Sequence, residues 1–268
     1  MNSILRVAVL IFSVWLGLCL LLFLLQKFLI FQSFGSTFGN CSEAKSYSFV
    51  AVEQNEVRFY HRQQAGAEGS LIYFHGNAGS ACDRLFFSEV LEGLPLNLIF
   101  LEYPGYGGEP RRKASQEAFL RAGLEVFDLI ESESPGPIFL FGESIGSSVA
   151  VWVAAQRIQS AGLILQAPAA SLVDIARRHY PWLPVKLLLR HPFPSIDWAP
   201  RVQAPSLVLF SETDEVVPPS SSKRLAAQLP HLKKLVAFKS MGHNQFLLQE
   251  TYQEQIRSFL KQELENHQ

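Results

Sequence analysis

The chain begins with a long apolar segment that carries no charge. Residues 7–25, between Arg6 and Lys27, read VAVLIFSVWLGLCLLLFLL. As an α-helix, these roughly 19 residues would extend about 28 Å, which is close to the hydrocarbon thickness of a bilayer. The pattern predicts one membrane-spanning helix at about residues 7–25, within an N-terminal anchor of residues 1–30.

Two other interpretations make this segment a removable leader. A secretory signal usually has an apolar core of about 7 to 15 residues that ends at a small-x-small cleavage site. The core here is longer, and the QKFLIFQSF that follows it contains no good site. A lipoprotein signal would need a small residue before Cys19, where the chain has Leu18. We therefore expect an uncleaved, single-pass anchor that attaches the protein to the bilayer.

The side of the membrane on which the rest of the chain lies stays undecided. The positive-inside rule compares the basic residues near the two ends of a span. Arg6 on one side is nearly balanced by Lys27 and the more distant Lys45 on the other. Cys41 and Cys82 could form a disulfide in an oxidising compartment, and two free thiols are an equally good interpretation.

After the anchor, short apolar runs alternate with helix-length segments, which is typical of an α/β sheet. Runs such as LIYF, LIFL, IFLF and LILQ are apolar nearly throughout, which indicates parallel strands buried on both faces. The pattern predicts a mostly parallel eight-stranded sheet flanked by helices. The expected strands are 47–52, 57–62, 70–74, 97–103, 137–142, 161–166, 206–210 and 235–239. The expected helices are 114–130, 144–156, 221–228 and 245–263.

Residues 171–200 interrupt this alternation, because they are rich in proline, aromatic and basic residues. The segment follows the strand that ends LILQAP, so it should leave the carboxyl edge of the sheet, where open α/β folds bind ligands. We expect a small lid of two short helices, in which Trp182 and Leu187 contact the substrate. The alternative is that residues 171–200 are an insertion with a structural role only, which does not contact the substrate.

The composition and charge of the chain favour a globular catalytic domain and argue against some classes of function. Hydrophobic residues make up 48% of the chain and charged residues 18%, so we expect residues 31–268 to form one globular catalytic domain. The net charge is −1, and the basic residues form no run longer than RRK. These features argue against a nucleic-acid partner.

The candidate chemistry begins at FLFGESIGSSVA, where an apolar strand meets a helix. The residues GESIG fit the pattern G-x-S-x-G, whose glycines let a strand turn so sharply into a helix that the serine hydroxyl is exposed. The first N–H groups of that helix also suit a developing oxyanion. We therefore expect Ser144 to be the nucleophile.

A second motif, LIYFHGNAGS, carries a buried strand into a loop with two glycines. Acyl transfer needs two backbone donors at the oxyanion, one from the residue after the nucleophile and one from an earlier loop. The N–H groups of Ile145 and Asn77 are the candidates. His75, in the same loop, is interpreted as a brace for the loop rather than as the base.

A serine hydroxyl needs a base, and the base needs an acid that sets its tautomer. Asp214 lies in SETDEVVPP after one expected strand and His243 in KSMGHNQF after the next, so both should reach the same sheet edge as Ser144. Glu212 and Glu215, the rivals of Asp214, are interpreted as solvated loop charges. No other group of histidine, cysteine and carboxylate has metal-ligand spacing, so we expect neither a metal nor a cofactor.

Together, HGNAGS, EYPGYGGEP, GESIGSSVA, SETDEVVP and MGHNQF resemble a branch of the α/β-hydrolases whose members are attached to membranes. The resemblance covers roughly residues 49–260. It implies the α/β-hydrolase fold, a triad of Ser144, Asp214 and His243, and an oxyanion loop at Asn77. The branch includes eukaryotic thioesterases that remove fatty acyl groups from proteins. Those enzymes reach membranes through a lipidated, cysteine-rich N-terminus, whereas this chain has an apolar helix, so their substrate does not transfer.

The motifs and the anchor together predict a membrane-attached serine hydrolase. Its substrate would be a small-molecule or lipid-like compound with an acyl ester or thioester bond. The candidates for contact with that substrate are His75, Tyr106, Trp182 and Leu187. A serine peptidase of the same fold and a catalytically idle, membrane-tethered binding protein are the alternatives.

Overall fold

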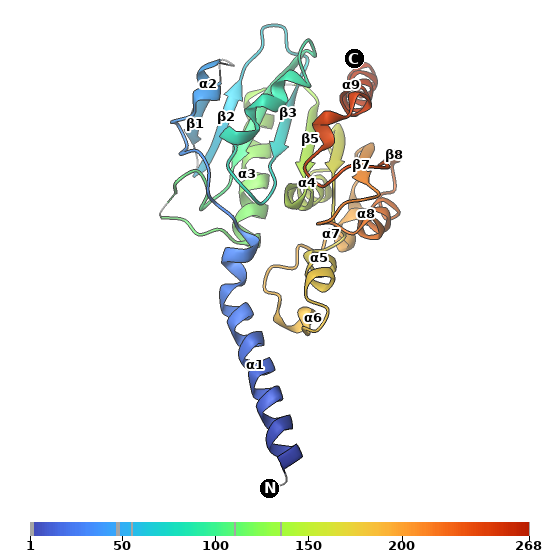
Figure 1. The fold of residues 1–268 in the computed structure, drawn as a ribbon. Coiled ribbons are helices and arrows are strands. Elements are labelled where there is room, and N and C mark those ends of the chain that lie inside the picture. The colour runs from blue at the N-terminus through green and yellow to red at the C-terminus, as the bar shows by residue number, and fades with distance from the viewer. Residues whose placement is uncertain (1–2, 47–48, 55, 110, 135, 268) are drawn as a thin grey trace.

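The computed structural model describes residues 3–46, 49–54, 56–109, 111–134 and 136–267. Within this part of the chain, eight strands form one sheet in the order β1-β2-β4-β3-β5-β6-β7-β8 (Figure 1). The strands are β1 (Val50–Gln54), β2 (Val57–Arg62), β3 (Gly69–Phe74), β4 (Leu96–Glu102), β5 (Ile138–Glu143), β6 (Gly162–Gln166), β7 (Ser206–Ser211) and β8 (Leu232–Phe238). The β1–β2 and β2–β4 pairs are antiparallel and the others are parallel, so the predicted mostly parallel sheet is confirmed.

Most strand boundaries lie within one residue of the sequence-based expectation, and the larger differences are in the first and last strands. The first strand starts at Val50, and the expected start at Tyr47 lies outside the described residues. The last strand starts at Leu232, three residues before the expected 235. Lys233 and Lys234 extend it, because β8 is an edge strand with exposed positions on which charged side chains are tolerated.

Helices cover both faces of the sheet and enclose one apolar cluster on each. Along β3, Ile72 belongs to one cluster and its neighbours Leu71 and Tyr73 to the other, as the alternation of side chains along a strand requires. The first cluster includes α3 and α4, and the second includes η1 and α9. These helices are η1 (Cys82–Glu89), α3 (Gln116–Glu133), α4 (Ile145–Gln156) and α9 (Glu250–Glu265). The remaining ones are α1 (Ser3–Ile30), α2 (Ser42–Ser46), α5 (Leu172–His179), α6 (Val185–Leu188), α7 (Ser195–Trp198), η2 (Ala199–Arg201), α8 (Pro219–Ala226) and η3 (Phe246–Leu248).

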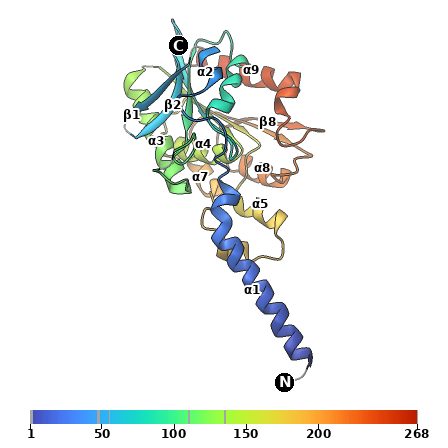
Figure 2. The same cartoon turned by 60° about the vertical axis from the view of Figure 1, so that its left-hand side comes forward.

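Helix α1 projects away from the sheet, and α5 and α6 of the lid lie beside its C-terminal half (Figures 1 and 2). It is 28 residues long and apolar enough to cross a membrane. Within it only Cys19 and Gln26 are buried. The indole N–H of Trp15 donates to the carbonyl of Trp182 at 3.3 Å. The lid therefore contacts α1 as far from the sheet as Trp15, near the middle of the helix.

A disulfide joins Cys41 to Cys82, with 5.9 Å between their Cα atoms. The bond connects the segment that follows α1 to the first residue of η1, and both cysteines are buried. The sequence left a bonded pair and two free thiols as alternatives, and the structure has the bonded pair. Disulfides persist in oxidising compartments and are rare in the cytosol.

Candidate active site

The turn from β5 into α4 presents Ser144 at the carboxyl edge of the sheet. Ser144 has φ 53° and ψ −118°, a strained backbone conformation that non-glycine residues rarely adopt. Residues in such conformations cluster at functional sites. A Cβ atom on Gly142 would overlap the Cα atom of Ser147, and one on Gly146 would overlap the carbonyl oxygen of Phe74. The two glycines are therefore required by the close approach of β5, α4 and β3 at this turn.

Ser144, His243 and Asp214 form one line of hydrogen bonds. His243 Nε2 lies 3.1 Å from Ser144 Oγ, and His243 Nδ1 lies 2.8 Å from Asp214 Oδ2. A carboxylate can only accept, so Nδ1 carries the proton and Nε2 is left to accept from the serine hydroxyl. Asp214 and His243 are buried and Ser144 is half-buried, facing a cavity.

Backbone donors hold Asp214 in this orientation. Its other oxygen, Oδ1, accepts from the N–H groups of Val216 and Val217, each at 2.8 Å. Glu212 is exposed, in agreement with its interpretation as a solvated charge. For Glu215 that interpretation needs correction, because its carboxylate accepts the backbone N–H of His243 at 3.0 Å and so helps to position the histidine loop.

Asn77 and Ile145 both line the cavity that contains Ser144. Ile145 is the first residue of α4, and the first N–H groups of a helix have no acceptor within it. The carbonyl of Asn77 accepts from the backbone N–H of Gln32 at 3.1 Å and from the hydroxyl of Tyr106 at 2.7 Å. The loop is thus fixed from both sides, close to the position where an oxyanion would form.

His75 and Tyr106 do not line this cavity, which corrects their assignment as substrate contacts. Both are fully buried beneath the loop. Tyr106 supports the Asn77 carbonyl, while His75 Nδ1 lies 2.7 Å from the carbonyl of Gly76 and its ring packs against Tyr103. The interpretation of His75 as a brace agrees with this placement.

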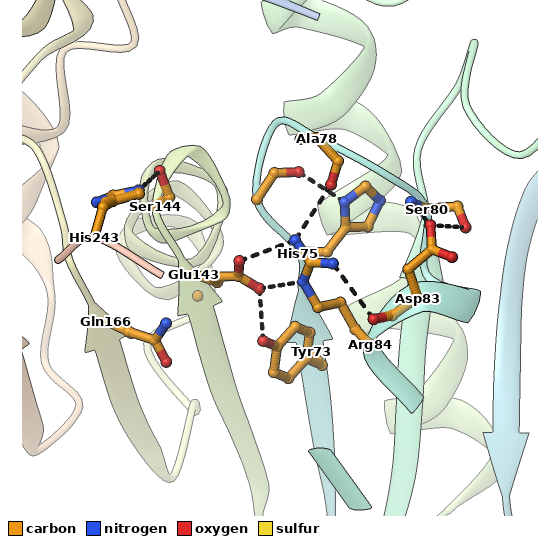
Figure 3. A network of polar contacts seen from close by, with 12 residues as sticks. Tyr73, His75, Ala78, Ser80, Asp83, Arg84, Glu143, Ser144, Gln166 and His243 are labelled. Atoms are coloured by element: carbon orange, nitrogen blue, oxygen red, sulfur yellow. Dashed lines mark hydrogen bonds and ion pairs between the residues drawn. The ribbon is translucent and has the colours of Figure 1, made fainter. Parts of the chain in front are cut away.

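A partly buried ion pair fixes the residue before the nucleophile. Arg84 Nε and Nη2 donate to Glu143 at 2.7 and 3.1 Å, and the hydroxyl of Tyr73 donates to the same carboxylate at 2.8 Å (Figure 3). Burial alone would raise the pKa of Glu143, but the charge and hydrogen bonds of Arg84 and the bond from Tyr73 outweigh it and lower that pKa. Glu143 is thus ionised, points away from His243 in Figure 3, and stabilises the turn.

The Ser144 cavity has a volume of about 350 Å³. Its lining includes Asn77, Ser144 and Ile145, the end of α1 with Leu29 and Ile30, and the lid residues Leu172, Ala176, Tyr180 and Leu189. Most of these side chains are apolar, as expected for a small-molecule site. No local sequence signal identified the residues from α1 and the lid, because their role depends on how two distant segments pack.

Trp182 and Leu187 are not among the lining residues, so their predicted contact with substrate inside the cavity needs correction. Both side chains are exposed, Trp182 at 47% and Leu187 at 85%.

The described residues contain one group with the geometry of a metal site, formed by Cys41, Glu43 and Cys82. Both cysteines are oxidised in the disulfide and therefore are not thiolate ligands.

Two kinds of known protein are similar to this chain in sequence. An uncharacterized protein of Mycobacterium tuberculosis is 35% identical over 226 residues, which cover 82% of this chain and 80% of that protein. The human alpha/beta hydrolase domain-containing protein 17C is 30% identical over 207 residues, which cover 74% of this chain and 59% of the human protein. The chain is thus similar in sequence to alpha/beta hydrolase domain-containing proteins. No protein-family model matches it.

Solved structures of α/β hydrolases have the same fold. A bacterial membrane phospholipase A superposes with a TM-score of 0.63 at 17% identity and covers 98% of this chain and 99% of its own. The esterase Est1E of Butyrivibrio proteoclasticus superposes with the same TM-score at 18% identity and covers 81% of this chain. The α/β-hydrolase fold predicted from the sequence motifs is thereby confirmed.

Proposed function

We propose that this α/β hydrolase is a serine hydrolase that cleaves ester or thioester bonds of acyl substrates. The observation that carries the proposal is the hydrogen-bonded line from Ser144 through His243 to Asp214, at 3.1 and 2.8 Å. Ser144 is the nucleophile, His243 the general base, and Asp214 the acid that fixes the tautomer of His243.

The reaction has two steps that use the same groups. In the first, His243 Nε2 takes the proton of Ser144 while Oγ attacks the carbonyl carbon, and the proton then passes to the departing alcohol or thiol. The N–H groups of Asn77 and Ile145 stabilise the negative oxygen of the tetrahedral intermediate. In the second step, His243 deprotonates a water molecule that attacks the acyl-enzyme and releases the carboxylic acid.

The cavity favours an acyl substrate over a peptide. Aliphatic side chains from α1 and the lid line it, and such a surface suits a hydrocarbon chain. The lid segment, residues 171–200, is short and contains only the small helices α5, α6 and α7 and the start of η2, whereas peptidases of this fold usually have a larger gating domain. Two proteins of the same fold, a membrane phospholipase A and an esterase, also support ester chemistry.

A substrate series tests this function. The purified protein should hydrolyse p-nitrophenyl esters and acyl-coenzyme A thioesters, with kcat/KM rising from acetyl to medium-chain substrates because longer chains bury more apolar surface. The Ser144→Ala variant measures the background. Folded protein that turns over none of these substrates would instead support the idle binding protein, and cleavage of peptides alone would support the peptidase.

We also propose that α1 is retained as a membrane anchor. Its exposed apolar face does not depend on charge for burial, so the full-length protein should sediment with membranes and resist extraction by high salt and alkaline carbonate. Release by carbonate, or a mature protein without residues 1–30, would contradict the anchor.

On a non-reducing gel, the same membrane fraction also reports whether the Cys41–Cys82 disulfide is intact, and hence whether the domain faces an oxidising compartment.

A further inference from the structure

We propose that the substrate is an ester lipid of the bilayer, whose acyl chain reaches Ser144 through an apolar groove between α1 and the lid. Helix α1 would then form one wall of the acyl-binding site in addition to anchoring the protein. This inference rests on the function proposed above, and it adds the source of the substrate and its route.

The acyl groove lies between the C-terminal half of α1 and helices α5 and α6 (Figure 1). Leu22, Phe23 and Leu29 line it from α1, and Leu183, Leu188 and Leu189 line it from the lid. Its lining is almost entirely hydrocarbon. A chain of methylene groups matches such a surface, whereas a polar or charged substrate would lose its hydration there without gaining hydrogen bonds.

The acyl groove lies directly beside the Ser144 cavity. Leu29 and Ile30 of α1 and Ala176, Tyr180 and Leu189 of the lid line both spaces. An acyl chain that lies in the acyl groove therefore leads to the place where its carbonyl carbon would meet Ser144.

Hydrogen bonds fix α1 against the lid at the acyl groove. The side-chain amide of Gln26 donates to the carbonyl of Leu188 at 3.2 Å, and its oxygen accepts the backbone N–H of Arg190 at 2.8 Å. The same amide also donates to the carbonyl of Phe23 at 2.8 Å. Gln26 is 7% exposed, and a buried amide is costly unless it is paired in this way. The contact between helix and lid is thus specific.

The end of α1 is also joined to the loop that carries Asn77. The backbone N–H of Gln32 donates to the carbonyl of Asn77 at 3.1 Å, and the N–H of Gly79 donates to the carbonyl of Gln32 at 3.3 Å. The side-chain amide of Asn77 also donates to the carbonyl of Ile30 at 3.4 Å. The anchor therefore ends inside the active site, without a flexible linker between them.

The position of the lid along α1 points to a bilayer lipid as the substrate. The lid contacts α1 from Trp15 to Gln26, a stretch of about 16 Å along a helix whose apolar part would lie in hydrocarbon. The exposed side chains of the lid include Trp182, Lys186 and Leu187, a combination of apolar and basic residues that is typical of the membrane interface. In this position the acyl groove opens toward lipid chains, and a lipid enters it without first passing into water.

The test compares a bilayer substrate with a soluble one in the full-length protein. The bilayer substrate is dioleoyl phosphatidylglycerol in mixed vesicles with dioleoyl phosphatidylethanolamine, measured by release of oleic acid. The soluble substrate is p-nitrophenyl butyrate. Leu22→Trp and Leu188→Trp fill the acyl groove at positions that do not line the Ser144 cavity. Leu24→Trp, on the 64% exposed surface of the same helix, is the matched control.

We expect each groove variant to release oleic acid at least about tenfold more slowly than the wild type, and to hydrolyse butyrate within about twofold of it. The control should match the wild type with both substrates. Groove variants that act normally on vesicles would overturn the route, and so would equal losses with both substrates. A wild type that cleaves butyrate but no vesicle lipid would overturn this inference and leave the proposed function standing, whereas failure with both substrates would overturn both.

Discussion

Alanine at Ser144 or at His243 should lower kcat by at least about 10³-fold with every ester or thioester that the wild type cleaves. The first substitution removes the attacking oxygen, and the second removes the only base within hydrogen-bond distance of it among the described residues. Because the two groups act as one unit, the double variant should be scarcely slower than either single one. Initial rates with a p-nitrophenyl ester, normalised to folded protein, provide the measurement.

The variants should stay folded, since neither side chain contributes to the apolar clusters. Circular dichroism and unchanged membrane sedimentation serve as controls. If the double variant were slower than the singles by the product of their effects, Ser144 and His243 would act independently and the proposed mechanism would fail.

Asparagine at Asp214 should lower kcat by about 10³- to 10⁴-fold while leaving KM nearly unchanged. The reason lies in the two donors from the backbone. The N–H groups of Val216 and Val217 require an acceptor at Oδ1, so the amide oxygen of an asparagine would take that place and its NH₂ group would face His243 Nδ1. Nδ1 would then have to accept, which moves the ring proton to Nε2 and leaves no base for Ser144.

Two neighbouring carboxylates are the controls for this substitution. Glu212→Gln changes an exposed residue, and Glu215→Gln keeps an oxygen that can accept the backbone N–H of His243. Each should lose less than about tenfold in kcat, because neither carboxylate contacts the imidazole ring of His243. A loss with Glu215→Gln as large as that with Asp214→Asn would indicate that the wrong acid has been assigned.

The parts of the site that the sequence could predict depend on short segments. The turn at Ser144 follows from two glycines and a strand that runs into a helix. Asp214 and His243 each follow an apolar run, and parallel strands end at the same edge of a sheet, so strand order alone predicts that their loops approach Ser144. In the structure, His243 lies within hydrogen-bond distance of both Ser144 and Asp214.

The parts that the sequence did not predict depend on packing between distant segments. The apolar pattern of α1 indicates a membrane span whether or not its last turn also lines a cavity, so Leu29 and Ile30 carry no local signal of that role. Trp182 and Leu187 are predicted to contact the substrate because they lie in an apolar, proline-flanked insert, yet both side chains are exposed in the structure. Gln26 directly follows the apolar run, and nothing in the local sequence indicates that its amide joins α1 to the lid.

Labelling with a fluorophosphonate probe tests the central claim most directly, because the probe reacts only with an activated serine hydroxyl. In detergent-solubilised full-length protein, mass spectrometry should find the adduct on Ser144, and the Ser144→Ala variant should remain unlabelled. Labelling of the alanine variant with an unchanged circular dichroism spectrum, or an adduct on any other serine of the wild type, would contradict the account.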